Sequence, residues 1–328
     1  MRDAHTKFEA HGIKLYAVSY DDQETLQEFA REQDIPYPLL SDIDSRVIEQ
    51  YGILNTEVSR DDAFLYGIPF PGVYVCDESG EVVATFFHDS YKKRDSAESL
   101  IDAALGRTLI DDDAPQADGG DGEIRITAAV QGGKASIRQG ILRKLIVRFD
   151  LGEGLHIYSD PVPKGMVATQ VEVSGPPGFT TLPMETPATE KLRLESMGVD
   201  LQVWSNTVDI VVPFYARGEL ASETRPLDSD TIDIEVKVRY QACTDNECLL
   251  PATEAFAFTL KMDVIDVPNL GFHKGHGQRE GRFDSTPAMR RLIWRKVKKN
   301  PLGLLKFLWK NIKLELGARK RAKQQNSH

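Results

Sequence analysis

Cysteine is scarce in this chain: its 328 residues include only three, Cys76, Cys243 and Cys248. So few thiols exclude a scaffold held together by many disulfides. Long apolar runs are also missing, and none approaches the roughly eighteen residues that a membrane-spanning helix needs. The segment Met1–Lys7 has no apolar stretch, so we expect no secretory signal peptide in the chain as printed.

Several catalytic patterns are absent as well. The sequence shows no Ser/His/Asp arrangement, no phosphate-binding loop and no paired catalytic carboxylates. The glycine pairs Gly119-Gly120 and Gly132-Gly133 read as linker and turn signals rather than nucleotide loops. We therefore expect neither a cofactor nor a bound metal.

Charge is unevenly distributed along the chain. The net charge is −10, but residues 286–328 hold thirteen Lys or Arg and one acid, Glu315, a net of +12. The other residues therefore carry −10 − 12 = −22. The net negative charge of residues 1–285, the acidic body, argues against nucleic-acid binding there. The basic tail, residues 286–328, is predicted to have a separate role.

Cys243 and Cys248 are separated by four polar, turn-forming residues and lie at the tip of a predicted hairpin, residues 242–252. In the strand before them, apolar residues alternate with polar ones from Ile232 to Gln241. If that alternation continues, Cys243 belongs to the polar series and both thiols face water. Cys76, in contrast, lies in an apolar strand and is expected to be buried and inert.

Three roles are open to the pair. A stapling disulfide would close a short loop and stabilise the fold by roughly 2 kcal/mol. A metal would need two further ligands, and the clustered candidates, His273 and His276, lie at no characteristic spacing. Reversible thiol–disulfide exchange is the role we favour, because short exposed disulfides are the labile kind.

The region around the pair resembles a known family. Residues 123–262 resemble the N-terminal domain of the thiol:disulfide interchange protein DsbD, in Gly154-Leu155-His156-Ile157-Tyr158, Pro176-Pro177-Gly178-Phe179 and Tyr240-Gln241-Ala242-Cys243 with Cys248 and Pro251. The resemblance implies an immunoglobulin-like β-sandwich in the periplasm. Its cysteine pair, here Cys243 and Cys248, takes electrons from a thioredoxin-like domain and passes them to substrate proteins. Tyr240 and Gln241 would be neighbours of that pair, and His156 and Tyr158 would have packing roles.

Residues 1–106 alternate predicted strands and helices. A buried strand is expected over Ile13–Tyr20, a helix capped by Asp21 follows, and a hairpin and a final helix ending at Gly106 complete the region. With Ala17-Val18-Ser19-Tyr20-Asp21, Pro38-Leu39-Leu40-Ser41-Asp42 and Gly67-Ile68-Pro69-Phe70-Pro71-Gly72, this region resembles the AhpC/TSA redoxins of the thioredoxin fold. The resemblance places Pro71 at the cis-proline position beside that fold's active site.

The redoxin resemblance is incomplete at its start. The family's cysteines precede the Ile13 strand, and the printed chain begins inside the helix that would carry them. We expect an N-terminally truncated α/β domain whose natural start lies upstream, the alternative being a decayed scaffold. As printed, it is not expected to reduce peroxide.

The sequence thus predicts four parts. They are a redoxin-like domain (1–106), a flexible acidic linker rich in Gly and Asp (107–122), the β-sandwich (123–263) and a basic tail with two amphipathic helices (264–328). The tail either docks on the acidic body or a partner, or binds a membrane surface through Leu305 and Trp309. The leading expectation is a thiol–disulfide oxidoreductase with a thioredoxin-like partner or a protein disulfide as substrate. The alternatives are a non-catalytic adaptor with a structural disulfide and, given an upstream extension, a peroxiredoxin-like antioxidant.

Overall fold

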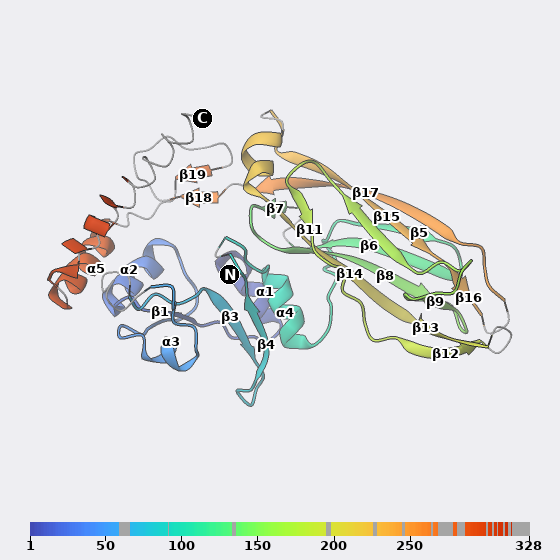
Figure 1. Cartoon of the computed structure of the whole chain (residues 1–328), viewed down its shortest axis with the longest axis horizontal. Helices are drawn as coiled ribbons and strands as arrows, with labels where there is room; N and C mark the ends of the chain where they lie inside the picture. The colour runs from blue at the N-terminus through green and yellow to red at the C-terminus, as the bar shows by residue number, and fades with distance from the viewer. Residues whose placement is uncertain are drawn as a thin grey trace. The chain divides into compact units, whose positions relative to one another are not determined.

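The computed structural model forms two compact units (Figure 1). One is built on Met1–Val73 together with residues from Glu280 onward, and the other on Tyr74–Val267. The boundaries predicted at residues 106 and 123 stay predictions. The residues that the structure describes are 1–58, 66–90, 92–132, 136–194, 198–225, 228–244, 247–263, 265–267, 278–280, 286–299, 301–303, 305–306, 308–310, 312–313 and 316.

The first unit mixes short helices with one pair of strands. Its elements are a 3-10 turn (Arg2–Ala4), α1 (His5–Ala10), β1 (Ala17–Ser19), α2 (Gln23–Glu32), β2 (Leu39–Ser41), α3 (Arg46–Gln50) and, far along the chain, α5 (Thr286–Lys299). Strand β1 pairs in parallel with β2. Helix α2 begins after Asp22, whose side chain accepts the Thr25 N–H at 2.8 Å. The predicted cap, Asp21, is wrong by one residue because its carboxylate accepts the Ser19 hydroxyl instead, at 2.6 Å.

The buried strand predicted over Ile13–Tyr20 is shorter and more exposed than expected. Only Ala17–Ser19 is extended, and Val18 in its middle is 46% exposed. Among the described residues β1 has β2 as its single partner, so much of this small sheet stays uncovered. The Phe70–Pro71 peptide is trans, because the cis bond in the described residues precedes Pro161. The cis-proline expected at Pro71 is therefore wrong, and the residues that directly follow Pro71, Gly72–Cys76, form a strand.

The predicted hairpin and final helix of the redoxin-like region are present. Strands β3 (Gly72–Cys76) and β4 (Val82–Phe87) pair with each other, and the turn is closed by Asp77, whose carboxylate accepts the Ser79 N–H at 2.9 Å. Helix α4 (Ala97–Leu105) ends at Gly106, which has a φ of 64°. Glycine suits that left-handed position because it has no Cβ.

The second unit is dominated by a β-sandwich, as predicted. One sheet has the order β10-β15-β17-β7, a second β11-β14-β8-β6-β5, and a third, smaller one β12-β13-β9-β16. The strands are β5 (Gln116–Gly120), β6 (Ile124–Gln131), β7 (Ser136–Arg138), β8 (Arg143–Leu151), β9 (His156–Tyr158), β10 (Gln170–Ser174), β11 (Phe179–Thr181), β12 (Glu190–Leu194), β13 (Val199–Ser205), β14 (Thr207–Ala216), β15 (Thr231–Tyr240), β16 (Ala242–Cys243) and β17 (Ala252–Asp263). A π-helical turn (Leu220–Thr224) and strands β18 (Ile265–Val267) and β19 (Gln278–Glu280) complete the described elements.

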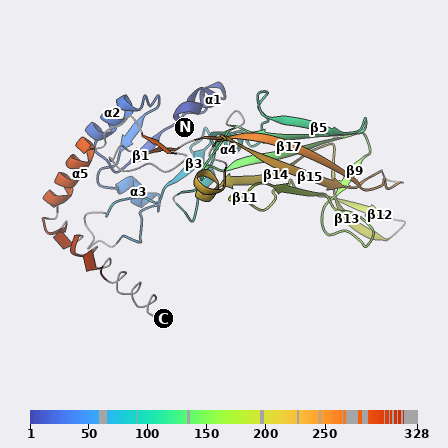
Figure 2. The same cartoon turned by 90° about the horizontal axis from the view of Figure 1, so that it is seen from above.

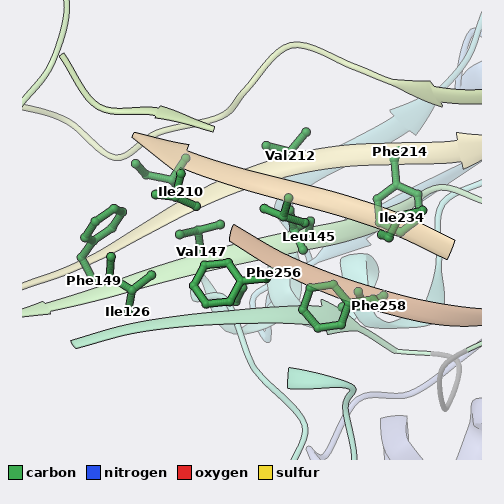
Figure 3. Close-up of a cluster of buried hydrophobic side chains, with 14 of the residues drawn as sticks. Ile126, Leu145, Val147, Phe149, Ile210, Val212, Phe214, Ile234, Phe256 and Phe258 are labelled. Carbon is green, nitrogen blue, oxygen red and sulfur yellow. The ribbon is translucent and has the colours of Figure 1, made fainter. Parts of the chain in front are cut away.

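The core lies between the first two sheets (Figure 3). Alternate residues of β15 are buried, as the period of two predicts, and they meet inward-facing residues of β8 and β14. The labelled side chains at this contact are Ile126, Leu145, Val147, Phe149, Ile210, Val212, Phe214, Ile234, Phe256 and Phe258. This contiguous apolar layer gives the second unit its rigidity and fixes the strand ends on which the cysteines sit.

The flexible linker predicted over residues 107–122 is contradicted by a hairpin. Residues 116–120 form β5, which pairs antiparallel with β6. Gly120 adopts a φ of 88°, and the Asp121 carboxylate accepts the N–H groups of Glu123 and Ile124 at 3.0 Å each. Gly and Asp are frequent in tight turns as well as in linkers, and here they form the tight turn between β5 and β6.

Helix α4 is fixed to the sandwich by buried charged groups. Arg143 Nη1 on β8 lies 3.0 Å from Glu98 Oε2, and Lys144 Nζ lies 3.3 Å from Asp102 Oδ2. The Gln131 side chain donates to the same Asp102 oxygen at 2.7 Å. Burial raises the pKa of Asp102, against the opposing effect of these donors. The final helix of the redoxin-like region is thus packed as part of the second unit.

We predict that Arg143→Met lowers the free energy of unfolding of the second unit by about 3 kcal/mol, because the buried Glu98 carboxylate would lose its ion pair with Arg143. Arg193→Met is the matched control, since Arg193 pairs with Asp200 in an exposed setting, at 2.9 Å, and its loss is expected to cost less than about 1 kcal/mol. Urea unfolding followed by the fluorescence of the buried Trp204 measures both. Equal losses in the two variants would contradict a structural role for the buried pair.

Candidate functional site: a facing thiol pair on the β-sandwich

The two cysteines face each other across a short antiparallel bridge. The Leu249 N–H donates to the Ala242 carbonyl at 2.9 Å, and the Thr244 N–H donates to the Glu247 carbonyl at 2.8 Å. These bonds flank the cysteines without joining them, so the two form a non-hydrogen-bonded pair. In such pairs the Cα atoms lie about 4.5 Å apart, which is within the range that a disulfide can bridge. Both thiols are free in this structure.

The exposure of the two thiols differs sharply. Cys243 is 1% exposed, whereas Cys248 is exposed. The expectation that Cys243 faces water is therefore wrong. Strand β15 ends at Tyr240, and the chain then joins a different sheet, where Cys243 of β16 pairs with His156 of β9. The alternation along β15 does not continue through this change of sheet.

Gln241 holds the chain where it passes between the two sheets. Its side-chain oxygen accepts the Val167 N–H at 2.9 Å, and its side-chain nitrogen donates to the Leu249 carbonyl at 3.0 Å. The second bond fixes the residue that directly follows Cys248. Gln241 therefore lies beside the thiol pair, as predicted. Tyr240 turns away into the core, where its ring packs on Phe149 at 5.4 Å between centroids.

Tyr158 is a site residue that the sequence reading missed. It is fully buried on β9, and its hydroxyl donates to Cys243 Sγ and lies 3.4 Å from Cys248 Sγ. The sequence predicted a packing role for it. The period-two pattern His156-Ile157-Tyr158 could have placed Tyr158 on one face, but nothing in the sequence indicates that β9 is the strand beside Cys243.

Burial and hydrogen bonds set the proton affinity of these groups. Burial, reinforced by the hydrogen bond with Cys248, raises the pKa of Cys243, and the Tyr158 hydrogen bond opposes that rise. Burial and the two neighbouring sulfurs also raise the pKa of Tyr158. At neutral pH the reduced site therefore holds a protonated buried thiol and a protonated phenol, with one sulfur open to solvent.

The other predicted residues belong to other parts of the chain. Pro71 belongs to the first unit, whereas both thiols belong to the second. Cys76 is exposed rather than buried, because Val75 takes the inward position near the end of β3 and the next residue points outward. The metal alternative involved His273 and His276, which lie outside the described residues. Within the described part of the chain no cluster of three or more His, Cys, Asp or Glu could hold a metal ion.

Two protein families match separate parts of the chain. Residues 1–85 match the AhpC/TSA family, and residues 126–260 match the family "Thiol:disulfide interchange protein DsbD, N-terminal". Both resemblances stated from the sequence are thereby confirmed.

Curated relatives match the N-terminal part. The "Putative peroxiredoxin bcp" of Haemophilus influenzae is 26% identical over 106 residues, which cover 31% of this chain and 63% of the relative. The chloroplastic peroxiredoxin Q of Gentiana triflora is 32% identical over 82 residues, covering 25% and 34%. The chain thus spans less than two thirds of the length of these relatives.

Solved structures match part of the chain at low similarity. The N-terminal periplasmic domain of ScsB from Proteus mirabilis is 14% identical, with a TM-score of 0.29, over 45% of this chain and 52% of that one. The reduced DsbD N-terminal domain of Neisseria meningitidis is 16% identical, with a TM-score of 0.24, over 36% and 82%. Taken together, the two family matches support a general thiol–disulfide redox function for a chain that joins a redoxin-like region to a DsbD-like β domain.

Proposed function

We propose that the protein is a thiol–disulfide oxidoreductase that carries two electrons on the Cys243–Cys248 pair. The observation that carries this proposal is the asymmetric pair itself: two facing sulfurs, one buried and one exposed, with a phenol hydroxyl beside both. A disulfide serving only as a staple has no need of an exposed sulfur or of a hydrogen-bond donor beside the buried one. Exchange needs both, because a partner must reach one sulfur while the other leaves.

The exchange begins at Cys248. In the oxidised protein, a thiolate of a reducing partner attacks Cys248 Sγ, the Cys243–Cys248 bond breaks, and the electron pair goes to Cys243 Sγ. The Tyr158 hydroxyl donates a hydrogen bond to that sulfur, which then takes up a proton from solvent because burial raises its pKa. The partner's second thiolate then attacks the partner sulfur that is bonded to Cys248. The partner's disulfide forms, and Cys248 leaves as a thiolate. The partner is oxidised, and the pair is reduced by two electrons.

The reduced pair then acts on a substrate disulfide. The Cys248 thiolate attacks one substrate sulfur, and the other substrate sulfur leaves as a thiolate. Cys243, once deprotonated, attacks Cys248 Sγ, restores the disulfide and releases the reduced substrate. We propose a thioredoxin-like protein as the electron donor and a protein disulfide as the acceptor. The DsbD resemblance supports this assignment and the periplasm as the compartment, where such disulfides persist.

The redoxin-like first unit is proposed as a partner module of this exchange. Its relatives are named peroxiredoxins, which keeps an antioxidant role as the second candidate. Peroxide consumption by the full chain, compared with its Cys76→Ser variant, tests that candidate. An adaptor with a structural disulfide is the remaining alternative, and it predicts no turnover with thiol partners.

We predict that Cys248, and not Cys243, forms the mixed disulfide. Both single variants are made in a Cys76→Ser background, because Cys76 is exposed and would react. The probe is a thioredoxin lacking its resolving cysteine and activated as a thionitrobenzoate mixed disulfide. Attack by a protein thiol on the thioredoxin sulfur releases the chromophore and leaves a covalent complex.

Cys243→Ser, which retains Cys248, is expected to form the complex at least tenfold faster than Cys248→Ser, whose remaining thiol is buried. Absorbance and non-reducing electrophoresis measure the rate and the product. Equal rates, or a faster Cys248→Ser variant, would show that the exposed sulfur is not the point of attack.

A second prediction concerns Tyr158. Replacement by Phe removes the hydrogen bond that favours the Cys243 thiolate, so the pKa of Cys243 rises further. The pH midpoint for re-forming the Cys243–Cys248 disulfide from the mixed disulfide is expected to move up by about one unit, since a hydrogen bond to a charged group is worth about 1.5 kcal/mol.

Tyr240→Phe is the matched control, because this buried tyrosine packs on Phe149 in the core, whereas Tyr158 is the tyrosine whose hydroxyl lies beside both sulfurs. Its midpoint is expected to stay at the wild-type value. Stopped-flow release of reduced substrate across a pH series measures all three proteins. A Tyr158→Phe profile that coincides with that of the control would remove Tyr158 from the exchange chemistry.

A further inference from the structure

Helix α5 lies beside α2 in the first unit (Figure 2), and ion pairs join the two helices. Arg291 donates to Glu28, and Arg295 Nη1 donates to Asp22 Oδ2 at 2.9 Å. Two of the tail's cations thus pair with acids of α2, one at its N-cap and one in its middle. Trp294 on α5 stays 63% exposed. This contact fixes α5, the start of the tail, on α2. The residues that follow α5 are then available for another role.

The stretch that follows α5 carries a row of exposed apolar side chains. Its described residues are helical, and the Lys306 N–H donates to the Leu302 carbonyl at 3.0 Å. The large apolar side chains are each about half to two-thirds exposed, and they are Leu305, Leu308, Trp309, Ile312 and Leu316. Spacings of three and four residues put them on one face of a helix. We call them the apolar row.

Lysines border the apolar row. Lys306, Lys310 and Lys313 are exposed along the same stretch, and Lys313 Nζ lies 5.9 Å from the centre of the Trp309 ring. The surrounding segment, residues 286–328, holds thirteen Lys or Arg and one acid. Exposing an apolar row of this size to water is unfavourable, so we expect a partner to cover it. The lysines along its border indicate that this partner is negatively charged.

The chemistry of the row fits a lipid surface better than a protein. Lysine is depleted in the buried centres of protein–protein interfaces, whereas at a bilayer its stem lies along the acyl boundary and its ammonium reaches the headgroups. Tryptophan is likewise enriched at that boundary. Among the described residues no helix is long and apolar enough to cross a bilayer, so a helix here would lie in the interface plane.

We propose that the apolar row binds the surface of an anionic lipid bilayer. Leu305, Trp309 and Ile312 enter the boundary between headgroups and acyl chains, and the neighbouring lysines contact lipid phosphates. Such binding would concentrate the protein at a membrane. It does not depend on the thiol chemistry, so either proposal can fail alone.

Tryptophan fluorescence of the full chain tests the proposal. Of the three tryptophans, Trp204 is buried and donates to the Pro187 carbonyl at 3.1 Å, so it acts as a constant background. Trp294→Phe leaves Trp309 as the responsive ring. With vesicles of phosphatidylglycerol and phosphatidylcholine at low salt, we expect a blue shift of its emission and quenching by lipids brominated near the headgroup. Pure phosphatidylcholine vesicles are expected to give neither.

Charge and insertion are separated by variants. Each of Lys306→Ser, Lys310→Ser and Lys313→Ser is expected to weaken binding about fivefold, which corresponds to about 1 kcal/mol per lysine near an anionic surface. Leu305→Ser is expected to weaken it similarly through lost apolar burial. Leu250→Ser is the matched control, since Leu250 is 89% exposed in the other unit, and its affinity is expected to be unchanged.

Two results would overturn the proposal. One is the absence of co-sedimentation with purely anionic vesicles at low salt. The other is a blue shift of Trp309 without lipid that tracks self-association in sedimentation equilibrium, which would assign the row to a second copy of the chain.

Discussion

Gln241 marks the point on which the geometry of the site depends. There the chain leaves one sheet of the sandwich and enters another, and both ends of the Gln241 amide are bound, to Val167 and to Leu249. The first residues of the new sheet place Cys243 against β9, and the bond to Leu249 fixes the returning strand that carries Cys248. A packed apolar core behind β15 keeps this crossing rigid, so the two sulfurs are held within bonding reach by the fold.

The two sulfurs are chemically different because their surroundings differ. Cys248 is exposed to water, whereas Cys243 is enclosed and accepts a hydrogen bond from the Tyr158 hydroxyl. Burial favours the neutral thiol at Cys243 and thereby stabilises the reduced state. The Tyr158 hydrogen bond favours the Cys243 thiolate, the form in which this sulfur leaves or attacks, and so offsets part of the effect of burial. In the exchange that we propose, the same asymmetry sets the direction: the partner attacks the exposed sulfur, and the buried sulfur is the leaving group. A staple would need neither feature.

Much of this fold follows from local pattern. The alternation from Ile232 to Tyr240 predicted β15 and its buried face, and the Asp77 turn predicted the β3–β4 hairpin. The errors arose where tertiary structure overrides a local signal. Asp118 to Gly122 have the composition of a linker, yet they pair with β6 and turn tightly. Cys243 was expected to face water because the alternation of β15 was extended past Tyr240. A period of two does not reveal that the chain enters another sheet there. Tyr158 was missed because the pairing of β9 with β16 joins residues 85 positions apart. The short spacing of the two cysteines indicated that they could meet, as their facing positions show, but it could not indicate which sulfur is exposed.

The central claim is that the Cys243–Cys248 bond forms and breaks reversibly under the conditions in which thiol partners operate. An equilibrium redox titration of the full chain in the Cys76→Ser background tests this most directly, with the oxidised fraction read by mass after alkylation in a series of glutathione buffers. We expect one two-electron transition with a midpoint potential above about −300 mV. A pair that stays oxidised below that potential, or two thiols that never join at any potential, would contradict it.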